Sequence, residues 1–188
     1  IKSPNHFLEQ VNKGNVEDVC IMIYTSGTTG PPKGAMVNHL NVAATAMASA
    51  QAMEVSQKDT VVSYLPLCHV AEQIFSLYLP LFVGNTVNFA ESIATIQQDL
   101  REIAPTVFLG VPRIWEKLHS SITIKIQDSS RFQRFFFDQC MAIGYRVANL
   151  RLDKKKINLG LKLSWRAGYW LIFRALQNYV GLRKVRIC

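Results

Sequence analysis

The chain has 188 residues, of which 49% are hydrophobic and 18% are charged. These proportions exclude an intrinsically disordered protein, and the length is sufficient for one domain with a sizeable core. The formal net charge of +8 comes from the second half of the chain, because acidic side chains outnumber basic ones through residue 100. A strongly basic half of a chain is typical of proteins that bind nucleic acid, a membrane surface or acidic ligands. Composition alone does not distinguish these three kinds of partner.

No run of 18 apolar residues and no signal peptide occurs in the sequence, so no membrane-spanning helix is expected. The cysteines have no metal-ligand spacing, which favours free thiols in a reducing compartment over disulfides. They are Cys20, Cys68, Cys140 and Cys188. We therefore expect a cytoplasmic protein, with peripheral contact to a membrane surface left open.

Apolar runs and helical periodicities alternate along the first 130 residues. After a polar start, the uninterrupted apolar run 19–23 predicts a buried strand. The other expected strands are 60–65, 86–89 and 106–110, and the expected helices are 38–53, 71–82, 93–103 and one that begins at Pro112. Strands that alternate with helices predict an α/β fold with a mostly parallel sheet flanked by helices.

Residues 133–180 are helical in pattern, basic and aromatic, and 182–188 resembles a strand. One helical stripe holds apolar side chains, with the cations Lys162, Arg166 and Arg174 off it. The stripe comprises Leu161, Trp165, Tyr169, Ile172 and Leu176. Residues 131–186 could lie on a membrane with their cations at anionic head groups, but an amphipathic helix packed on the domain is favoured. No nucleic-acid partner is expected, because no known binding motif is present.

The first expected strand leads into a loop of glycines, hydroxyls and one lysine. The glycines allow close backbone approach to an anion, the hydroxyls can bond phosphate oxygens or magnesium, and Lys33 adds a positive charge. A Walker A loop is excluded, because Lys33 lies between Pro32 and Gly34. A surface turn rich in glycine and threonine is the less favoured alternative. The stretch is Tyr24-Thr25-Ser26-Gly27-Thr28-Thr29-Gly30-Pro31-Pro32-Lys33-Gly34.

This stretch closely resembles the signature of the adenylate-forming (AMP-binding) enzymes, which include the acyl-CoA synthetases. The resemblance implies that a carboxylate attacks the α-phosphate of magnesium-ATP, and that a thiol then displaces AMP from the acyl-adenylate. It also implies that Thr25 helps to hold Mg²⁺ and that Thr25 and Lys33 act in catalysis, by stabilising the leaving pyrophosphate. The implied ATP-binding residues are Thr25, Ser26, Gly27, Thr28, Thr29, Gly30 and Lys33.

A single histidine follows the second expected strand, in the segment 65–70. From the residues alone, a packed core histidine is favoured for His69. Acyl-CoA synthetases, however, carry a Pro-x-x-His element at this distance after the phosphate loop, which Pro66 and His69 match. That resemblance implies that His69 is an active-site residue that orients the substrate. Some family members have a tryptophan gate four residues later, where this chain has Gln73.

A third element, residues 110–117, resembles the Val-Pro-Arg-x-Trp/Phe-Glu-Lys segment of the long-chain acyl-CoA synthetase branch. The resemblance implies that Gly110 and Val111 line an acyl pocket, whose small and apolar walls suit an alkyl chain. Arg113 falls in the first turn of the expected helix, near the ligand edge of the sheet, which makes it a substrate-binding candidate. The alternative is a surface arginine paired with an acid such as Glu116.

The resemblance covers essentially all 188 residues, although relatives run several hundred residues further. We therefore expect residues 1–188 to be a fragment of the N-terminal adenylation domain, inactive alone, of a long-chain fatty acid–CoA ligase. Its ligands would be fatty acid, ATP with Mg²⁺, and CoA. Two alternatives stay open: another adenylating enzyme, specific for aryl or medium-chain acids or loading a carrier protein, and a non-catalytic relative that binds acyl chains or nucleotide.

Overall fold

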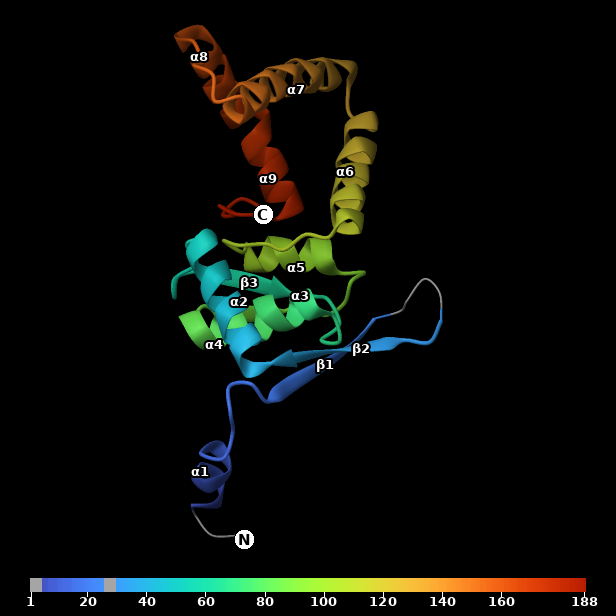
Figure 1. Cartoon of the computed structure of the whole chain (residues 1–188). Coiled ribbons are helices and arrows are strands. Elements are labelled where there is room, and N and C mark those ends of the chain that lie inside the picture. The colour runs from blue at the N-terminus through green and yellow to red at the C-terminus, as the bar shows by residue number, and fades with distance from the viewer. Residues whose placement is uncertain (1–4, 26–29) are drawn as a thin grey trace. The chain divides into compact units, whose positions relative to one another are not determined.

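The computed structural model describes residues 5–25 and 30–188. These form two compact units, Ile1–Ile93 and Ala94–Arg186, and Cys188 belongs to the second. The first unit combines helices with strands and the second unit is almost entirely helical, as the ribbon in Figure 1 shows along the chain. The expected α/β fold class is therefore confirmed.

The first unit contains two separate two-stranded sheets, one antiparallel (β1 with β2) and one parallel (β3 with β4). In the described residues the expected parallel sheet is thus a single parallel pair. The elements are α1 His6–Val11, β1 Val19–Thr25, β2 Lys33–Asn38, α2 His39–Ala52, β3 Thr60–Ser63, α3 Val70–Gln73, the π-helical turn η1 Ile74–Tyr78, α4 Leu79–Val83 and β4 Thr86–Phe89.

The antiparallel hairpin β1–β2 corrects one prediction. No strand was expected between β1 and the helix 38–53, but β2 lies there and pairs Met36 with Met22 on β1. Helix α2 then begins where it was predicted, because Asn38 caps it: the Asn41 N–H donates to Asn38 Oδ1 over 2.7 Å. The loop is therefore carried by a hairpin whose second strand continues into a capped helix.

The parallel pair holds the core of the first unit. Strand β4 has the bounds that the sequence predicted, and Thr60 pairs with Thr86 in register. The expected helix 71–82 is confirmed as the continuous run α3–η1–α4, which ends at Gly84 with a φ of +85°. Val62 on β3 and Leu79 on α4 are both buried. This packing fixes the end of β3, from which the predicted histidine segment begins.

The second unit is almost entirely helical. The expected helix 93–103 begins three residues late, and the helix at Pro112 is confirmed. The expected strands 106–110 and 182–188 do not form as continuous strands. Each keeps one β-bridge residue, Val107 and Ile187, and the Arg186 N–H donates to the Thr106 carbonyl over 2.9 Å. The elements are α5 Ile96–Ile103, α6 Pro112–Gln127, α7 Arg131–Leu152, α8 Leu159–Gly168, the π-helical turn η2 Tyr169–Phe173 and α9 Arg174–Val180.

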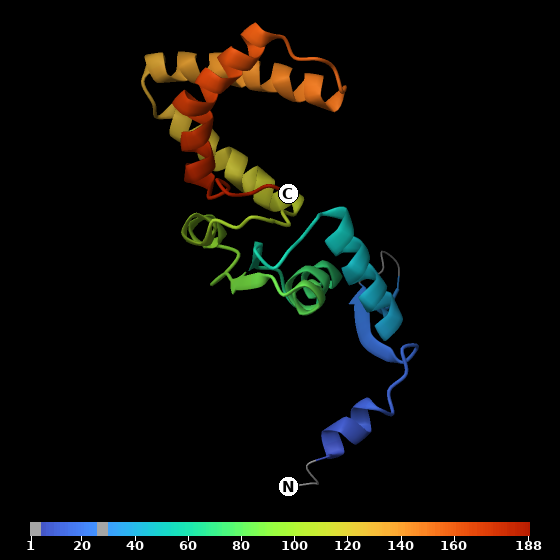
Figure 2. The ribbon, with the colours of Figure 1, turned by 90° about the vertical axis from the view of Figure 1, so that its left-hand side faces the viewer.

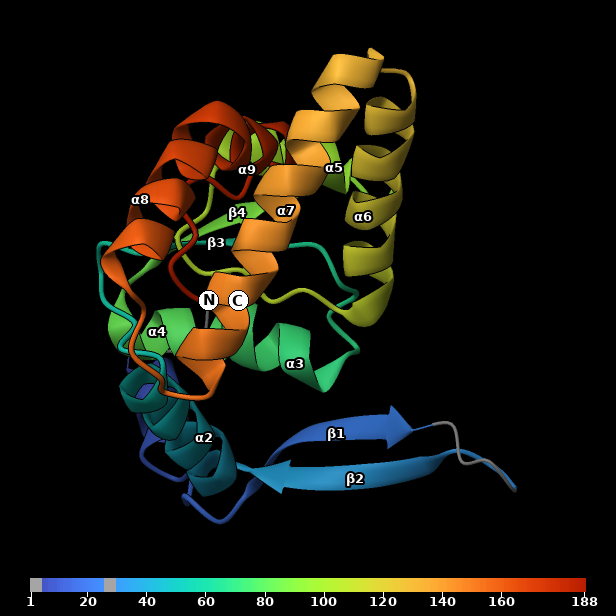
Figure 3. The same ribbon diagram turned by 90° about the horizontal axis from the view of Figure 1, so that it is seen from above.

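Two glycines allow the long helix α7 to pack closely against the α8–η2 helix. A Cβ atom at Gly144 would lie 2.9 Å from Phe173 Cζ, and one at Gly168 would lie 3.5 Å from the Cys140 sulfur. Helix α7 runs across α8 in Figures 1 and 2, and Figure 3 shows it between α6 and α8. The helical region predicted for 133–180 is thus confirmed, with a break between Leu152 and Leu159.

No helix in residues 5–25 and 30–188 is long and apolar enough to cross a membrane. The four cysteines are free, as predicted.

Candidate active site

Thr25 and Lys33 lie opposite each other at the loop end of the β1–β2 hairpin. They are paired residues in the strand register, and the Thr25 hydroxyl donates to the Lys33 carbonyl over 3.4 Å. Both are exposed. The predicted phosphate-binding residues between them, Ser26, Gly27, Thr28 and Thr29, lie outside the described residues. The hairpin therefore fixes the two ends of the loop and brings its lysine and one of its hydroxyls together.

Gly30 continues the loop on the β2 side with a φ of +108°, a conformation that L side chains rarely adopt. A Cβ atom there would meet no atom within 4 Å. The glycine is thus required by backbone conformation rather than by crowding. An exposed backbone at positive φ can present its N–H to an anion.

The charge of Lys33 is available to a ligand. Lys33 has no ion pair with a carboxylate in the described part of the chain, so its charge is not neutralised there. The same residues contain no group of three His, Cys, Asp or Glu side chains that could hold a metal by themselves. A single hydroxyl, that of Thr25, fits Mg²⁺ that is held mainly by nucleotide phosphates and water.

His69 is exposed and caps helix α3, so the alternative of a packed core histidine is wrong. Its Nδ1 accepts the Ala71 backbone N–H over 3.2 Å. An accepting Nδ1 carries no proton, so the neutral ring holds its proton on Nε2. His69 can therefore donate a hydrogen bond from Nε2 to an oxygen of a substrate.

The turn that carries His69 is held by local hydrogen bonds. The Gln73 side-chain amide donates to the Leu67 carbonyl over 2.7 Å, and the His69 N–H donates to the Pro66 carbonyl over 2.8 Å. Gln73, at the position where some relatives carry a gating tryptophan, thus braces the turn in this chain.

Glu72 is a residue of this region that sequence reasoning missed. Its side chain is only 2% exposed, and its carboxylate accepts hydrogen bonds from the Ser63 hydroxyl, the Ser76 hydroxyl and the Leu65 N–H. These bonds join the end of β3 to the helix that begins after His69. The spacing of Glu72 and Ser76, one helical turn apart, was the available signal, but Ser63 is brought in by the fold.

We expect Glu72→Ala to lower the free energy of unfolding by about 2–4 kcal/mol, because it leaves three donors without their acceptor beside β3. Denaturant titration of the purified protein measures this change. Glu91→Ala removes an exposed carboxylate from the same unit and should change stability by less than about 0.5 kcal/mol. Equal effects of the two substitutions would contradict the bracing role of Glu72.

Gly110 and Trp115 contact each other in the second unit. The Trp115 Nε1–H donates to the Gly110 carbonyl over 2.9 Å, and a Cβ atom at position 110 would lie only 2.5 Å from that nitrogen. The Phe108 ring meets the Trp115 ring edge to face at 5.8 Å between centroids. Glycine at 110 is therefore needed for the indole to close over the segment before α6.

Val111 is the N-cap residue of α6, and Arg113 lies in the first turn, exposed. The alternative pair of Arg113 with Glu116 does not form, because neither of these two described residues has an ion pair. Arg113 is therefore open to a ligand from outside the helix.

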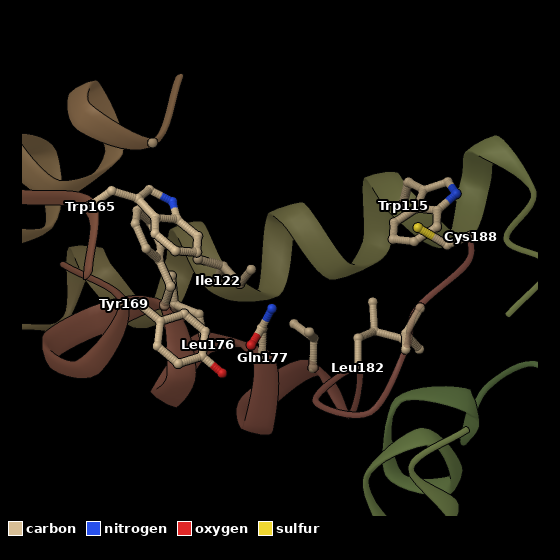
Figure 4. Close-up of a pocket in the computed structure, with 12 residues that line it drawn as sticks. Trp115, Ile122, Trp165, Tyr169, Leu176, Gln177, Leu182 and Cys188 are labelled. Carbon is tan, nitrogen blue, oxygen red and sulfur yellow. The ribbon is translucent and has the colours of Figure 1, made fainter. Parts of the chain in front are cut away.

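Trp115 also lines an apolar cavity of about 500 Å³ within the second unit. Figure 4 shows side chains from α6 and from the helix run α8–η2–α9 around it. The stripe residues Trp165, Tyr169 and Leu176 line this cavity and are half-buried, so this side of the helix run faces the rest of the unit. A cavity of this size with hydrocarbon and aromatic walls can take an apolar ligand.

Comparison with known proteins places these elements in a family. The model of the family described as "AMP-binding enzyme" matches residues 2–159. The chain belongs to this family.

Two curated members of the family are similar along most of the chain. A long-chain fatty-acid–CoA ligase, ACSBG2 of Mus musculus, is 35% identical over 187 residues, which are 95% of this chain and 28% of that protein. The putative fatty-acid–CoA ligase fadD11 of Mycobacterium tuberculosis is 31% identical over 171 residues, 90% of this chain and 30% of the relative. The chain thus spans less than a third of the length of these AMP-binding enzymes.

A solved structure shows the same fold. The O-succinylbenzoate coenzyme A synthetase of Bacillus subtilis, in complex with AMP, superposes with a TM-score of 0.51 at 24% identity. The superposition covers 56% of this chain and 22% of the synthetase. The predicted fold of the adenylate-forming enzymes is therefore confirmed for this chain.

Proposed function

We propose that residues 1–188 are part of the N-terminal adenylation domain of a ligase that joins a long-chain fatty acid to CoA through an acyl-adenylate. The observation that carries the proposal is the 35% identity to a long-chain fatty-acid–CoA ligase across 95% of the chain. The exposed Lys33 and Thr25 at the two ends of the loop support it.

In the first step of the proposed reaction, a carboxylate oxygen of the fatty acid bonds to the α-phosphorus of ATP, and pyrophosphate leaves. Negative charge grows on the leaving group, and Lys33 is the cation that offsets it. Residues Thr25 to Gly30 bind the phosphates through hydroxyls and backbone N–H groups. Mg²⁺, which Thr25 would help to hold, adds positive charge at the phosphate oxygens when it is bound.

His69 takes an orienting role in this proposal. Its Nε2–H donates to an oxygen of the fatty-acid carboxylate or of the α-phosphate, while Nδ1 stays bonded to the helix that His69 caps. Gly110 and Val111 line the acyl site, and Arg113 contributes a free guanidinium to the substrate. In the second step the CoA thiolate attacks the acyl carbonyl carbon, and AMP leaves.

The test is product formation by the full-length protein with a long-chain fatty acid, ATP, Mg²⁺ and CoA. We expect acyl-CoA and AMP in equal amounts, whereas the 188-residue chain alone should form neither. Formation of ADP, or thioester formation with an aryl acid or a carrier protein in preference to the fatty acid and CoA, would overturn the proposal. So would a folded full-length protein that binds acyl chains or nucleotide without turnover.

A further inference from the structure

The helix run α8–η2–α9 has a second apolar face that the unit does not cover. The stripe predicted from the sequence points into the unit, but four other large apolar side chains on the same run are exposed. Their positions are i, i+4, i+11 and i+12, a helical spacing that places them on one side of the helix run. This outer stripe consists of Leu159, Leu163, Trp170 and Leu171.

Cations accompany the outer stripe along its length. Lys162 and Arg166 are exposed and alternate with its leucines, and the Arg174 guanidinium lies 4.8 Å from the centre of the Trp170 ring. The exposed segment Lys154–Lys155–Lys156 precedes the helix. Asp153 offsets Lys155 there, and the helix run itself contains no acidic residue.

We propose that the outer stripe of α8–η2 lies on an anionic lipid surface, with its leucines and Trp170 at the level of the head groups. Its mixture of exposed aliphatic side chains, one tryptophan and unpaired cations is the composition of an interfacial helix. The basic charge of this half of the chain, concentrated in residues 101–188, complements anionic lipids over a wider area.

The proposal differs from the membrane contact considered from the sequence alone. That contact covered residues 131–186 without choosing an apolar face, and in the structure Trp165 and Tyr169 line the apolar cavity of the second unit. The face opposite to them is the one that meets lipid here. The proposed lipid contact does not depend on the ligase reaction, because no residue of the outer stripe belongs to the candidate active site.

Sedimentation of the full-length protein with vesicles tests the apolar part of this surface. The vesicles consist of phosphatidylcholine, alone or mixed with phosphatidylserine. We expect binding to the anionic vesicles, and a drop of at least about tenfold for the double variant Leu163→Ser/Leu171→Ser. The matched control is Ile124→Ser on α6, since Ile124 and Leu163 are both 60% exposed. The control should bind like wild type.

The cations are tested separately with Lys162→Gln/Arg166→Gln. Each neutralised cation should weaken binding to anionic vesicles about fivefold, and high salt should weaken wild-type binding in the same direction. Arg183→Gln/Lys184→Gln removes the same charge from exposed positions off the helix. It should have a smaller effect.

Tryptophan fluorescence locates the contact. Anionic vesicles should shift the emission of the wild type to shorter wavelength, and Trp170→Phe should remove that shift while it keeps the binding. The proposal is overturned if wild type fails to bind anionic vesicles or if Ile124→Ser weakens binding as much as the outer-stripe variant. It is also overturned if the outer-stripe substitutions instead abolish self-association without lipid, which would make this face an interface between two copies.

Discussion

Lys33→Ala should slow fatty-acid-dependent exchange of pyrophosphate into ATP by about 10²–10³-fold, the usual loss on removing one preorganised electrostatic partner from a transition state. The lysine is exposed at the base of the phosphate loop, and no described carboxylate competes for its charge. The substitution therefore removes charge without opening a cavity. Stability in denaturant should change by less than about 0.5 kcal/mol.

Lys58→Ala is the control for Lys33→Ala. Lys58 is an exposed lysine of the same unit that lies outside the loop, so its loss should leave exchange unchanged. If the two variants exchange pyrophosphate at the same rate, Lys33 does not serve the adenylation step.

Gly181→Ala should destabilise the second unit by about 3 kcal/mol or more. Gly181 ends helix α9 with a φ of +81°, and a Cβ atom there would lie 2.3 Å from the Leu100 carbonyl carbon and 2.5 Å from the Arg101 nitrogen. The left-handed conformation alone costs an alanine about 1 kcal/mol, and the backbone of α5 must move as well, because both contacts are with main-chain atoms. Denaturant unfolding of wild type and variant measures the difference.

Gly160→Ala is the matched control for this prediction. It lies in the helix α8, and its nearest contact for a Cβ atom is the Asn158 side chain at 3.9 Å. Alanine should be neutral there or stabilise the helix by up to about 1 kcal/mol. Comparable destabilisation at both positions would contradict the close approach of α9 to α5.

Local sequence signals predicted the elements whose formation depends on neighbouring residues. Asn38 and Pro112 begin α2 and α6 as expected, because a cap and a first-turn proline act within the helix they start. Strand β2 was missed, because its residues include Lys33 and Gly34, and the strand exists through pairing with β1. In segment 106–110 a strand was predicted from the apolar residues, but only Val107 forms a β-bridge and no continuous strand results.

In the candidate site, too, the sequence predicted residues within contiguous motifs and missed residues that the fold brings together. Motif residues such as Thr25, Lys33 and His69 could be predicted because the loop and the Pro-x-x-His element are contiguous in sequence. Glu72 could not, because its partner Ser63 lies on another element. The sequence also could not show which apolar stripe of α8–η2 is covered, because both faces of this helix are apolar and packing against α6, α7 and the C-terminal segment decides it.

The central claim is that this chain belongs to a protein that adenylates long-chain fatty acids. Exchange of labelled pyrophosphate into ATP by the full-length protein tests it most directly, because this half-reaction needs no CoA. With a series of acids of increasing length, we predict exchange that is greatest for long acyl chains and absent without acid. No exchange with any acid, from protein shown to be folded, would contradict the claim.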